Sequence, residues 1–195
     1  KNGPSWDWGN ITVGNVPWQF ETPANPCADS WEGIYCKYIT TGHNSSCYVE
    51  RLLLVYRNLS GQLPNSLQAF RFLKNLVLAA NSLNGTIPAA IGNLSLLTKL
   101  DLSLNSLTGH IPEGFDGLLG LSDLVLDSNE LSGTIPQWRN LPSLAHFALR
   151  YNYLTGTVPS IIGSYSLLKE LYLNRNLLFG TLPNELGALT TLLTF

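Results

Sequence analysis

The stretch LKNLVLAANSLNGTIP, residues 73–88, returns along the sequence at almost constant intervals. Its pattern is Leu-x-x-Leu-x-Leu-x-x-Asn-x-Leu-x-Gly-x-Ile-Pro, and successive copies are 24, 24, 24, 23, 24 and 24 residues apart. The copies begin at Val49, Leu73, Leu97, Leu121, Leu144, Leu168 and Leu192. Six copies are complete and the seventh stops at Phe195, so a repeat of about 24 residues organises the sequence from residue 49 onward.

The spacing of the leucines predicts how one repeat folds. Leu73, Leu76 and Leu78 share one side of a short strand and of the bend before it, so all three point inward. A single coil cannot bury them, whereas stacked coils place their strands about 4.8 Å apart in a parallel sheet and form one continuous core. We therefore predict a solenoid in which an isolated repeat does not fold.

Three further positions of the repeat serve the backbone. An asparagine stands where each coil leaves its strand, and its amide can both donate and accept hydrogen bonds inside the stack. A glycine then permits a tight bend, and a proline fixes φ and ends strand pairing. The asparagines are Asn81, Asn105, Asn129, Asn152 and Asn176, and Arg57 takes this position in the first coil.

The Leu-x-Gly-x-Ile-Pro string is the signature of plant-type leucine-rich repeats, and six copies of it lie within residues 49–191. Before them, Pro26-Cys27, Trp31-Glu32-Gly33-Ile34 and Cys36 resemble the Cys-x-x-x-Trp-x-Gly-Val-x-Cys cap of plant receptor-like kinase and receptor-like protein ectodomains. The opening Lys1 to Trp6 is similar to algal and protist relatives.

This resemblance implies an α/β solenoid, a right-handed leucine-rich-repeat superhelix with a parallel concave β-sheet. It also implies a plant-type second strand and a disulfide-bonded N-terminal cap. We expect a capping region over residues 1–48 and repeats over residues 49–195. A helix that usually precedes the cap in the family is missing, so we expect the capping region to be truncated at its start and the seventh repeat to be cut.

Three cysteines lie in the first quarter of the sequence. The resemblance implies that Cys27 pairs with Cys36, with Trp31 covering the open end of the core. Cys47 departs from the common pattern, so residues 37–46 can instead be an insertion held by a Cys36–Cys47 disulfide, with Cys27 bonded to an upstream partner. The sequence leaves both arrangements open.

Charge and glycosylation signals indicate the environment of the protein. Eleven Lys and Arg residues balance 13 Asp and Glu residues without a run of either sign, which argues against nucleic-acid partners and anionic membranes. The apolar runs are too short for direct membrane insertion. Five Asn-x-Ser/Thr sequons favour the secretory pathway and an extracellular or cell-surface location. They lie at Asn10, Asn44, Asn58, Asn84 and Asn93, and we expect glycans on the last three, which lie outside the inward leucine positions.

Residues suited to catalysis are sparse. His43 and His110 have no evident partner, and motifs for phosphate, zinc or dinucleotide binding are missing. Asp123 and Asp127 are about 13 Å apart on an extended strand, too far to share a calcium ion with ligands near about 2.4 Å. We therefore predict a protein that is not an enzyme and that needs neither a cofactor nor a metal.

The repeat also predicts which residues face outward from the concave sheet. These positions are apolar in the first two coils, acidic in the middle and rich in Tyr, Arg and His in the last two. Tyr and Arg often dominate interfaces, because they bury large areas and form directional hydrogen bonds. The candidate ligand-binding residues are His146, Arg150, Tyr151, Tyr153, Tyr172 and Arg175.

Two classes of function fit these patterns. The first is a recognition module of a receptor-like or secreted protein that binds a protein, peptide or glycan, with acidic or aromatic ligands favoured. The second is a structural subunit of an extracellular matrix, cell wall or surface filament, whose apolar first coils pack against sister subunits. Ice binding ranks lower: the residues that follow the repeat glycines are Thr86, His110, Thr134, Thr157 and Thr181, and packing of the second sheet explains this ladder equally well.

Overall fold

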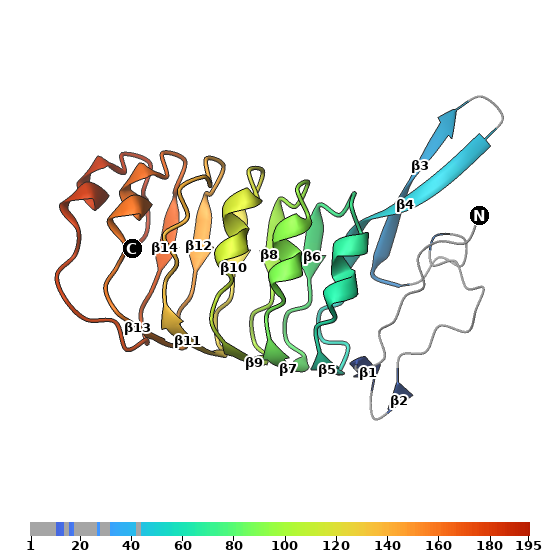
Figure 1. Cartoon of the computed structure of the whole chain (residues 1–195), viewed down its shortest axis with the longest axis horizontal. Helices are drawn as coiled ribbons and strands as arrows, with labels where there is room; N and C mark the ends of the chain where they lie inside the picture. Colours follow the sequence, from blue (N-terminus) through green and yellow to red (C-terminus); the bar gives the residue numbers. More distant parts are fainter. Residues whose placement is uncertain (1–10, 14–15, 18–26, 28–31, 42–43) are drawn as a thin grey trace.

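A computed structural model describes residues 11–13, 16–17, 27, 32–41 and 44–195, and it confirms the predicted leucine-rich-repeat solenoid (Figure 1). Successive coils lie side by side in one row, with a strand on one side of each coil and a short helix on the other side of most. In the described part of the chain, no helix is long and apolar enough to cross a membrane. We number the coils 1 to 6, with boundaries at residues 49, 73, 97, 121, 144, 168 and 192.

The concave sheet has seven strands in the order β14-β12-β10-β8-β6-β4-β3. All of its pairs are parallel except β3 with β4, which form an antiparallel hairpin at the N-terminal end. The strands are β3 (Ile34–Thr41), β4 (Asn44–Leu53), β6 (Asn75–Val77), β8 (Lys99–Asp101), β10 (Asp123–Val125), β12 (His146–Ala148) and β14 (Glu170–Tyr172).

The second sheet follows the order β13-β11-β9-β7-β5-β1-β2. Its strands are β1 (Ile11–Val13), β2 (Val16–Pro17), β5 (Leu59–Gln62), β7 (Ser82–Thr86), β9 (Ser106–Gly109), β11 (Glu130–Thr134) and β13 (Tyr153–Thr155). The strands from the coils pair in parallel, whereas β1 adds to β5 in the antiparallel sense. The repeat pattern does not predict β1, because this strand lies outside the repeats.

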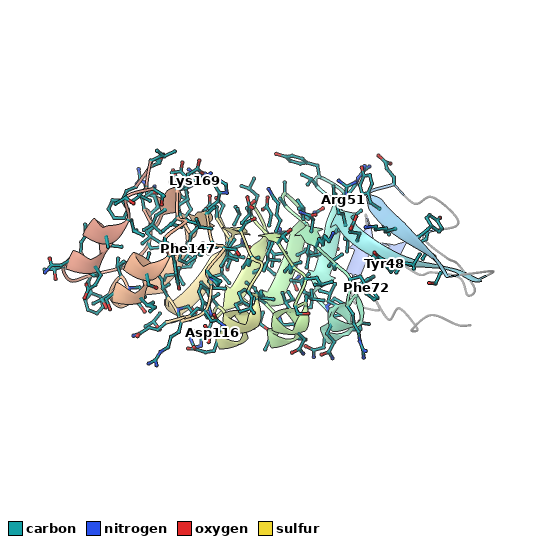
Figure 2. The ribbon with its side chains drawn as sticks, turned by 90° about the horizontal axis from the view of Figure 1, so that it is seen from above. Tyr48, Arg51, Phe72, Asp116, Phe147 and Lys169 are labelled. Atoms are coloured by element: carbon teal, nitrogen blue, oxygen red, sulfur yellow. A yellow bond between two sulfur atoms is a disulfide. The ribbon has the colours of Figure 1, made fainter. Side chains whose placement is uncertain are left out.

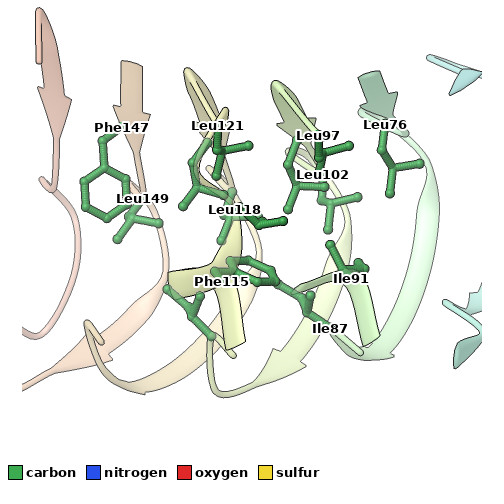
Figure 3. Packing of buried hydrophobic residues seen from close by; sticks show 14 of the residues in the cluster. Leu76, Ile87, Ile91, Leu97, Leu102, Phe115, Leu118, Leu121, Phe147 and Leu149 are labelled. Carbon is green, nitrogen blue, oxygen red and sulfur yellow. The ribbon is translucent and has the colours of Figure 1, made fainter. Parts of the chain in front are cut away.

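The predicted inward leucines form the core. Leu73, Leu76 and Leu78 have no exposed surface, and the matching residues of neighbouring coils line up behind one another (Figure 3). Burial of one such side chain stabilises the fold by about 1.5–3 kcal/mol relative to exposure. Because each coil supplies only a thin layer, these contacts exist only in the stack.

The asparagine ladder makes the hydrogen bonds that its position in the repeat requires. The Oδ1 of Asn129 accepts a hydrogen bond from the Leu107 amide at 3.0 Å. Its Nδ2 donates to the carbonyl oxygens of Leu102 at 3.0 Å and Leu126 at 3.2 Å. The same three bonds recur at Asn81, Asn105, Asn152 and Asn176. The asparagines therefore link each coil to the preceding one, as predicted.

The helical segments of the described residues are all 3₁₀-helices. Each spans five residues and directly follows the repeat proline, which has no N–H to donate to a sheet and so ends strand pairing. They are η1 (Asn65–Ala69), η2 (Ala89–Asn93), η3 (Glu113–Gly117), η4 (Ser160–Ser164) and η5 (Asn184–Ala188). A single apolar side chain, such as Ile91 or Phe115, is buried in each of η1 to η4.

Coil 4 has no such helix. It is the copy with 23 residues, and Trp138 occupies the space that a helix residue fills elsewhere. The indole is 1% exposed, lies 5.9 Å from the ring of Phe115 and 6.0 Å from that of Phe147, and donates from Nε1 to the Pro112 carbonyl at 3.2 Å. The Tyr165 hydroxyl donates in turn to the Trp138 carbonyl at 2.7 Å. In the sequence, the one-residue shortening of this repeat and the presence of Trp138 together indicate that coil 4 lacks the helix.

The N-terminal cap contains the disulfide that the family resemblance implied. Cys27 and Cys36 are bonded, with Cα atoms 5.5 Å apart, which excludes the Cys36–Cys47 alternative. Residues 37–41 lie in β3 and residues 44–46 in β4, and Cys47 of β4 lies opposite Tyr38 of β3. Strand β4 crosses the expected boundary at residue 48/49, so cap and first coil share one strand. The expected role of Trp31 lies outside the described residues.

The threonines that follow the repeat glycines have a packing role. A side chain at Gly109, which has φ 77°, would lie 2.9 Å from Cγ2 of Thr86, so the threonine methyl packs where glycine leaves space. In the second sheet Thr86 is paired with Thr108 and Thr134 with Thr155, so equivalent residues are staggered by two positions per coil. Equivalent positions of successive coils therefore do not lie directly opposite one another in the second sheet.

Candidate functional site

The concave face is built from in-register columns of outward residues. The middle residue of each short strand, such as Leu100 or Leu124, is fully buried, so its two neighbours point away from the core. The register confirms two predicted columns: Arg51, Asn75, Lys99, Asp123, His146 and Glu170, followed by Leu53, Val77, Asp101, Val125, Ala148 and Tyr172. Figure 2 shows Arg51 and Lys169 on this side of the molecule and Asp116 of η3 on the opposite side.

Arg150 is the most constrained polar side chain of this face. Its Nε donates to Oδ2 of Asp127 at 2.6 Å, and its backbone amide donates to Oδ1 of the same carboxylate at 2.9 Å. The guanidinium carbon lies 4.8 Å from the centroid of the Tyr172 ring, a cation–π contact. The salt bridge uses Nε, and among the described residues nothing accepts a hydrogen bond from the two terminal Nη groups, so they can bind an incoming acceptor.

Asp127 holds Arg150 from a buried position. Only 6% of the residue is exposed, and this burial raises the pKa of its carboxyl, while the neighbouring Arg150 guanidinium partly counteracts the rise. Sequence reasoning assigned Asp127 to a hydrated acidic patch and missed this role. A signal was present, since Asp127 and Arg150 occupy the same repeat position in adjacent coils with opposite charge.

His146 lies beside two carboxylates. Its Nδ1 is 3.1 Å from Oδ1 of Asp123, but the geometry is not that of a hydrogen bond. Glu170 is its partner in the next strand, and Ser122 donates a hydrogen bond to the other oxygen of Asp123. His146 therefore contributes to the same face, on strand β12 next to β14.

The other three predicted residues lie at the edge where the chain leaves the concave sheet. Tyr151 and Arg175 are exposed and have left-handed backbone conformations, with φ of 56° and 61°. Tyr153 requires a correction, because it is the first residue of β13 and so belongs to the second sheet. Asn152 between the two tyrosines is buried, whereas both tyrosines are exposed. The predicted set is thus divided between a concave group, His146, Arg150 and Tyr172, and a rim group, Tyr151, Tyr153 and Arg175.

The three sequons with described side chains lie outside the concave sheet. Asn58 follows the turn after β4, Asn84 lies in β7 and Asn93 ends η2, and all three side chains are exposed. Asn10 and the side chain of Asn44 lie outside the described residues. Within the part of the chain that the structure describes, no three His, Cys, Asp or Glu residues are grouped so as to hold a metal ion.

Comparison with known proteins places this geometry in context. The family model described as leucine rich repeat matches residues 71–131, and a second model of the same description matches residues 167–189. The search of curated proteins gave no match.

Solved structures with the same fold are extracellular domains of plant receptors. The chain is 31% identical to the BIR2 ectodomain from Arabidopsis thaliana, with a TM-score of 0.72 over 88% of this chain and 89% of that one. It is 30% identical to a chain of the BIR3–SERK2 complex from Arabidopsis thaliana, with a TM-score of 0.73 over 89% of this chain and 92% of that one.

Longer receptors match over part of their length. One is a chain of the Arabidopsis receptor kinase HAESA in complex with the peptide hormone IDA and the co-receptor SERK1. It is 30% identical, with a TM-score of 0.79 over 95% of this chain and 31% of that one. The chain likewise spans only 24% of a TDR receptor chain.

Proposed function

Because the chain belongs to the plant-type extracellular leucine-rich-repeat family, we propose that it recognises an extended peptide, or an extended segment of a protein, along its concave face. The observation that carries this proposal is the fixed Arg150 side chain, held by Asp127 and stacked on Tyr172. A guanidinium that is already oriented loses little conformational entropy when a ligand binds it. Similar solved structures support this ligand class, since they include HAESA in complex with the peptide hormone IDA and the plant peptide hormone receptor RGFR1 in complex with RGF2.

The chemistry of the face favours a ligand that carries a carboxylate or an aromatic ring. The free Nη groups of Arg150 suit a carboxylate, and the Tyr172 ring beside them offers an apolar surface. From β4 to β14 the face spans roughly 24 Å, which corresponds to about seven residues of extended peptide. Asp123 next to His146 disfavours a ligand that is anionic along its whole length.

A library of fluorescent heptapeptides, each with a central Asp, Glu, Phe or Tyr or with the matching amide or Ala, tests this proposal by anisotropy. Replacing Arg150 and Tyr172 together by Ala should cost more than about 2 kcal/mol, or roughly 30-fold in Kd. Arg139→Ala is the matched control, because it removes an equal charge from an exposed position after Trp138 on the convex side. Unchanged affinity in the double variant, with an intact circular dichroism spectrum, would place the binding site elsewhere.

We propose further that the protein passes through the secretory pathway and carries N-linked glycans at Asn58, Asn84 and Asn93. Each side chain is exposed and none lies on the concave sheet, so sugars there would leave the ligand face open. Protein expressed in a eukaryotic secretory host should lose mass on enzymatic deglycosylation. Peptide mapping should locate the modified residues, and an unchanged mass would contradict this assignment.

A further inference from the structure

The rim between the two sheets carries an exposed aromatic patch in its C-terminal half. We define the rim patch as Tyr151, Tyr153 and Leu177, which are 53%, 57% and 59% exposed. Tyr151 lies at the left-handed turn of coil 5, Tyr153 two residues later, and Leu177 at the position of Tyr153 in coil 6. All three side chains come from two neighbouring coils at the same rim, and exposed apolar patches are typical of protein–protein contacts.

Two charged residues of opposite sign flank the rim patch. Glu130 of coil 4 occupies the repeat position of Tyr153, and Arg175 of coil 6 occupies that of Tyr151. Both are exposed, and neither forms a salt bridge within the described part of the chain. Arg150, in contrast, is already paired with Asp127. The rim therefore presents one anion and one cation, each one coil away from the two tyrosines.

This arrangement is self-complementary. In a two-fold symmetric contact, if residue i of one copy contacts residue j of the other, then residue j of the first copy contacts residue i of the second. Two residues of opposite charge on either side of the axis can therefore form two equivalent ion pairs. With the axis at coil 5, Glu130 of each copy faces Arg175 of the other, and the tyrosines of the two copies pack around the axis. The sequons Asn58, Asn84 and Asn93 lie in coils 1 and 2, so glycans at these sites would not cover the patch.

We propose that the rim patch is a homodimer interface, closed by two reciprocal Glu130–Arg175 ion pairs. The partner is a second copy of this chain. The same surface carries the two tyrosines at its centre, an anion one coil before them and a cation one coil after them, as a two-fold contact requires. Only a few side chains of each copy take part in this interface, so the dimer is weak and depends on concentration. The proposal does not rest on ligand binding at the concave face.

Sedimentation velocity on the full chain tests the proposal over concentrations from roughly 1 μM to roughly 1 mM. The weight-average mass should rise from one chain toward two across this range. Tyr151→Ser combined with Tyr153→Ser should keep the protein monomeric throughout. Tyr56→Ser is the matched control, since it removes an exposed tyrosine from the same left-handed position in coil 1 and should leave association unchanged.

Charge-reversal variants distinguish a specific interface from non-specific association. Glu130→Arg alone should place like charges opposite each other twice and shift dimerisation to at least about tenfold higher concentration, and Arg175→Glu alone should do the same. The protein with both reversals should dimerise as the unmodified protein does, because the two ion pairs are restored with exchanged sign. A monomeric unmodified protein at every concentration, or a double reversal that does not recover dimerisation, would overturn the proposal.

Discussion

Coils 3 and 4 are neighbours in the middle of the solenoid, yet they complete their two surfaces differently. Coil 3 closes its convex side with the helix η3 and the buried Phe115, and on the concave side its Asp101 binds Ser103 within the same coil. Coil 4 has Trp138 in place of a helix, and its Asp127 binds Arg150 of coil 5. At these two positions coil 3 uses residues of its own, whereas coil 4 makes contacts with both neighbouring coils.

This difference shows which features of a coil are required. The stack needs an apolar side chain at the convex position and partners for its backbone groups, and a helix is only one way to supply them. In coil 4 the backbone N–H of Asn140 donates to Oδ1 of Asp116 at 2.8 Å. The convex side of coil 4 is therefore hydrogen-bonded to the preceding coil although it has no helix. Coil 4 should therefore respond to side-chain changes that a helical coil tolerates.

Trp138→Ala should have the largest effect, a loss of about 3–5 kcal/mol in the free energy of unfolding. The change removes a fully buried ring, its stacking on Phe115 and Phe147, and the hydrogen bond to Pro112. Urea denaturation followed by circular dichroism measures it. Trp138→Phe should retain a substantial part of the stability, because apolar volume is kept. A loss below about 1 kcal/mol for Trp138→Ala would mean that coil 4 does not depend on this side chain.

Asn129→Ala should cost about 1–3 kcal/mol, because it leaves buried backbone groups of coils 3 and 4 without partners. The affected groups include the Leu107 amide and the Leu102 carbonyl, both in coil 3. Chemical denaturation of the single variant gives the value. Asn93→Ala serves as the comparison, since its amide is exposed and its loss should change stability by less than about 0.5 kcal/mol. Equal effects at the two positions would contradict the structural role of the ladder.

Tyr165→Phe should cost about 1 kcal/mol by removing the hydrogen bond that coil 5 donates to the Trp138 carbonyl. Burial raises the pKa of the Tyr165 phenol, so its hydroxyl stays protonated and remains a donor. Thermal or urea unfolding detects the change, with Tyr153→Phe as an exposed control. If the two variants have the same stability, the link from coil 5 to coil 4 is dispensable.

Asp127 should give the smallest effect, a dependence of stability on acid pH. Because burial raises the pKa of Asp127 in the folded protein above its unfolded value, the folded state binds this proton more tightly. The contribution is fully present below the unfolded-state pKa and is lost as pH rises through the folded-state pKa. In the unmodified protein, Asp127 makes the free energy of unfolding decrease as pH rises through its folded-state pKa. Asp127→Asn should abolish this decrease, whereas Ser103→Ala in coil 3 should leave the pH dependence unchanged. A slope unaffected by Asp127→Asn would indicate an ordinary pKa.

The repeat made much of this fold predictable from sequence. Leu73, Leu76 and Leu78 are inward because stacking dictates it, and Asn129 makes the bonds that its position requires. The pairing of Cys27 with Cys36 followed from the resemblance of the cap to a known family. The leucine and asparagine features depend on position within the repeat, so the sequence of one coil is enough to predict them.

Features that depend on contacts between unlike coils were harder to predict. The hairpin β3–β4 lies mainly outside the repeats, where no period guides the assignment. The Asp127–Arg150 pair requires knowledge of the side-chain direction in two adjacent coils. Tyr153 was assigned to the concave face because the sequence does not state where the strand ends and the chain turns. Each case needs the register in space as well as the order of residues.

The left-handed backbone at the eighth position of every coil limits the chemistry that the rim can display. The six residues there have φ between 54° and 61° and are Tyr56, Ala80, Leu104, Ser128, Tyr151 and Arg175. A side chain branched at Cβ is strongly disfavoured in this conformation, and proline cannot adopt it. Substitutions at this position are therefore expected to exclude Val, Ile, Thr and Pro. If the rim comes to bind a new partner, the substitutions available at this position are flexible or planar side chains. The rim is therefore suited to contacts that can adapt, and less suited to a rigid fit made by β-branched side chains.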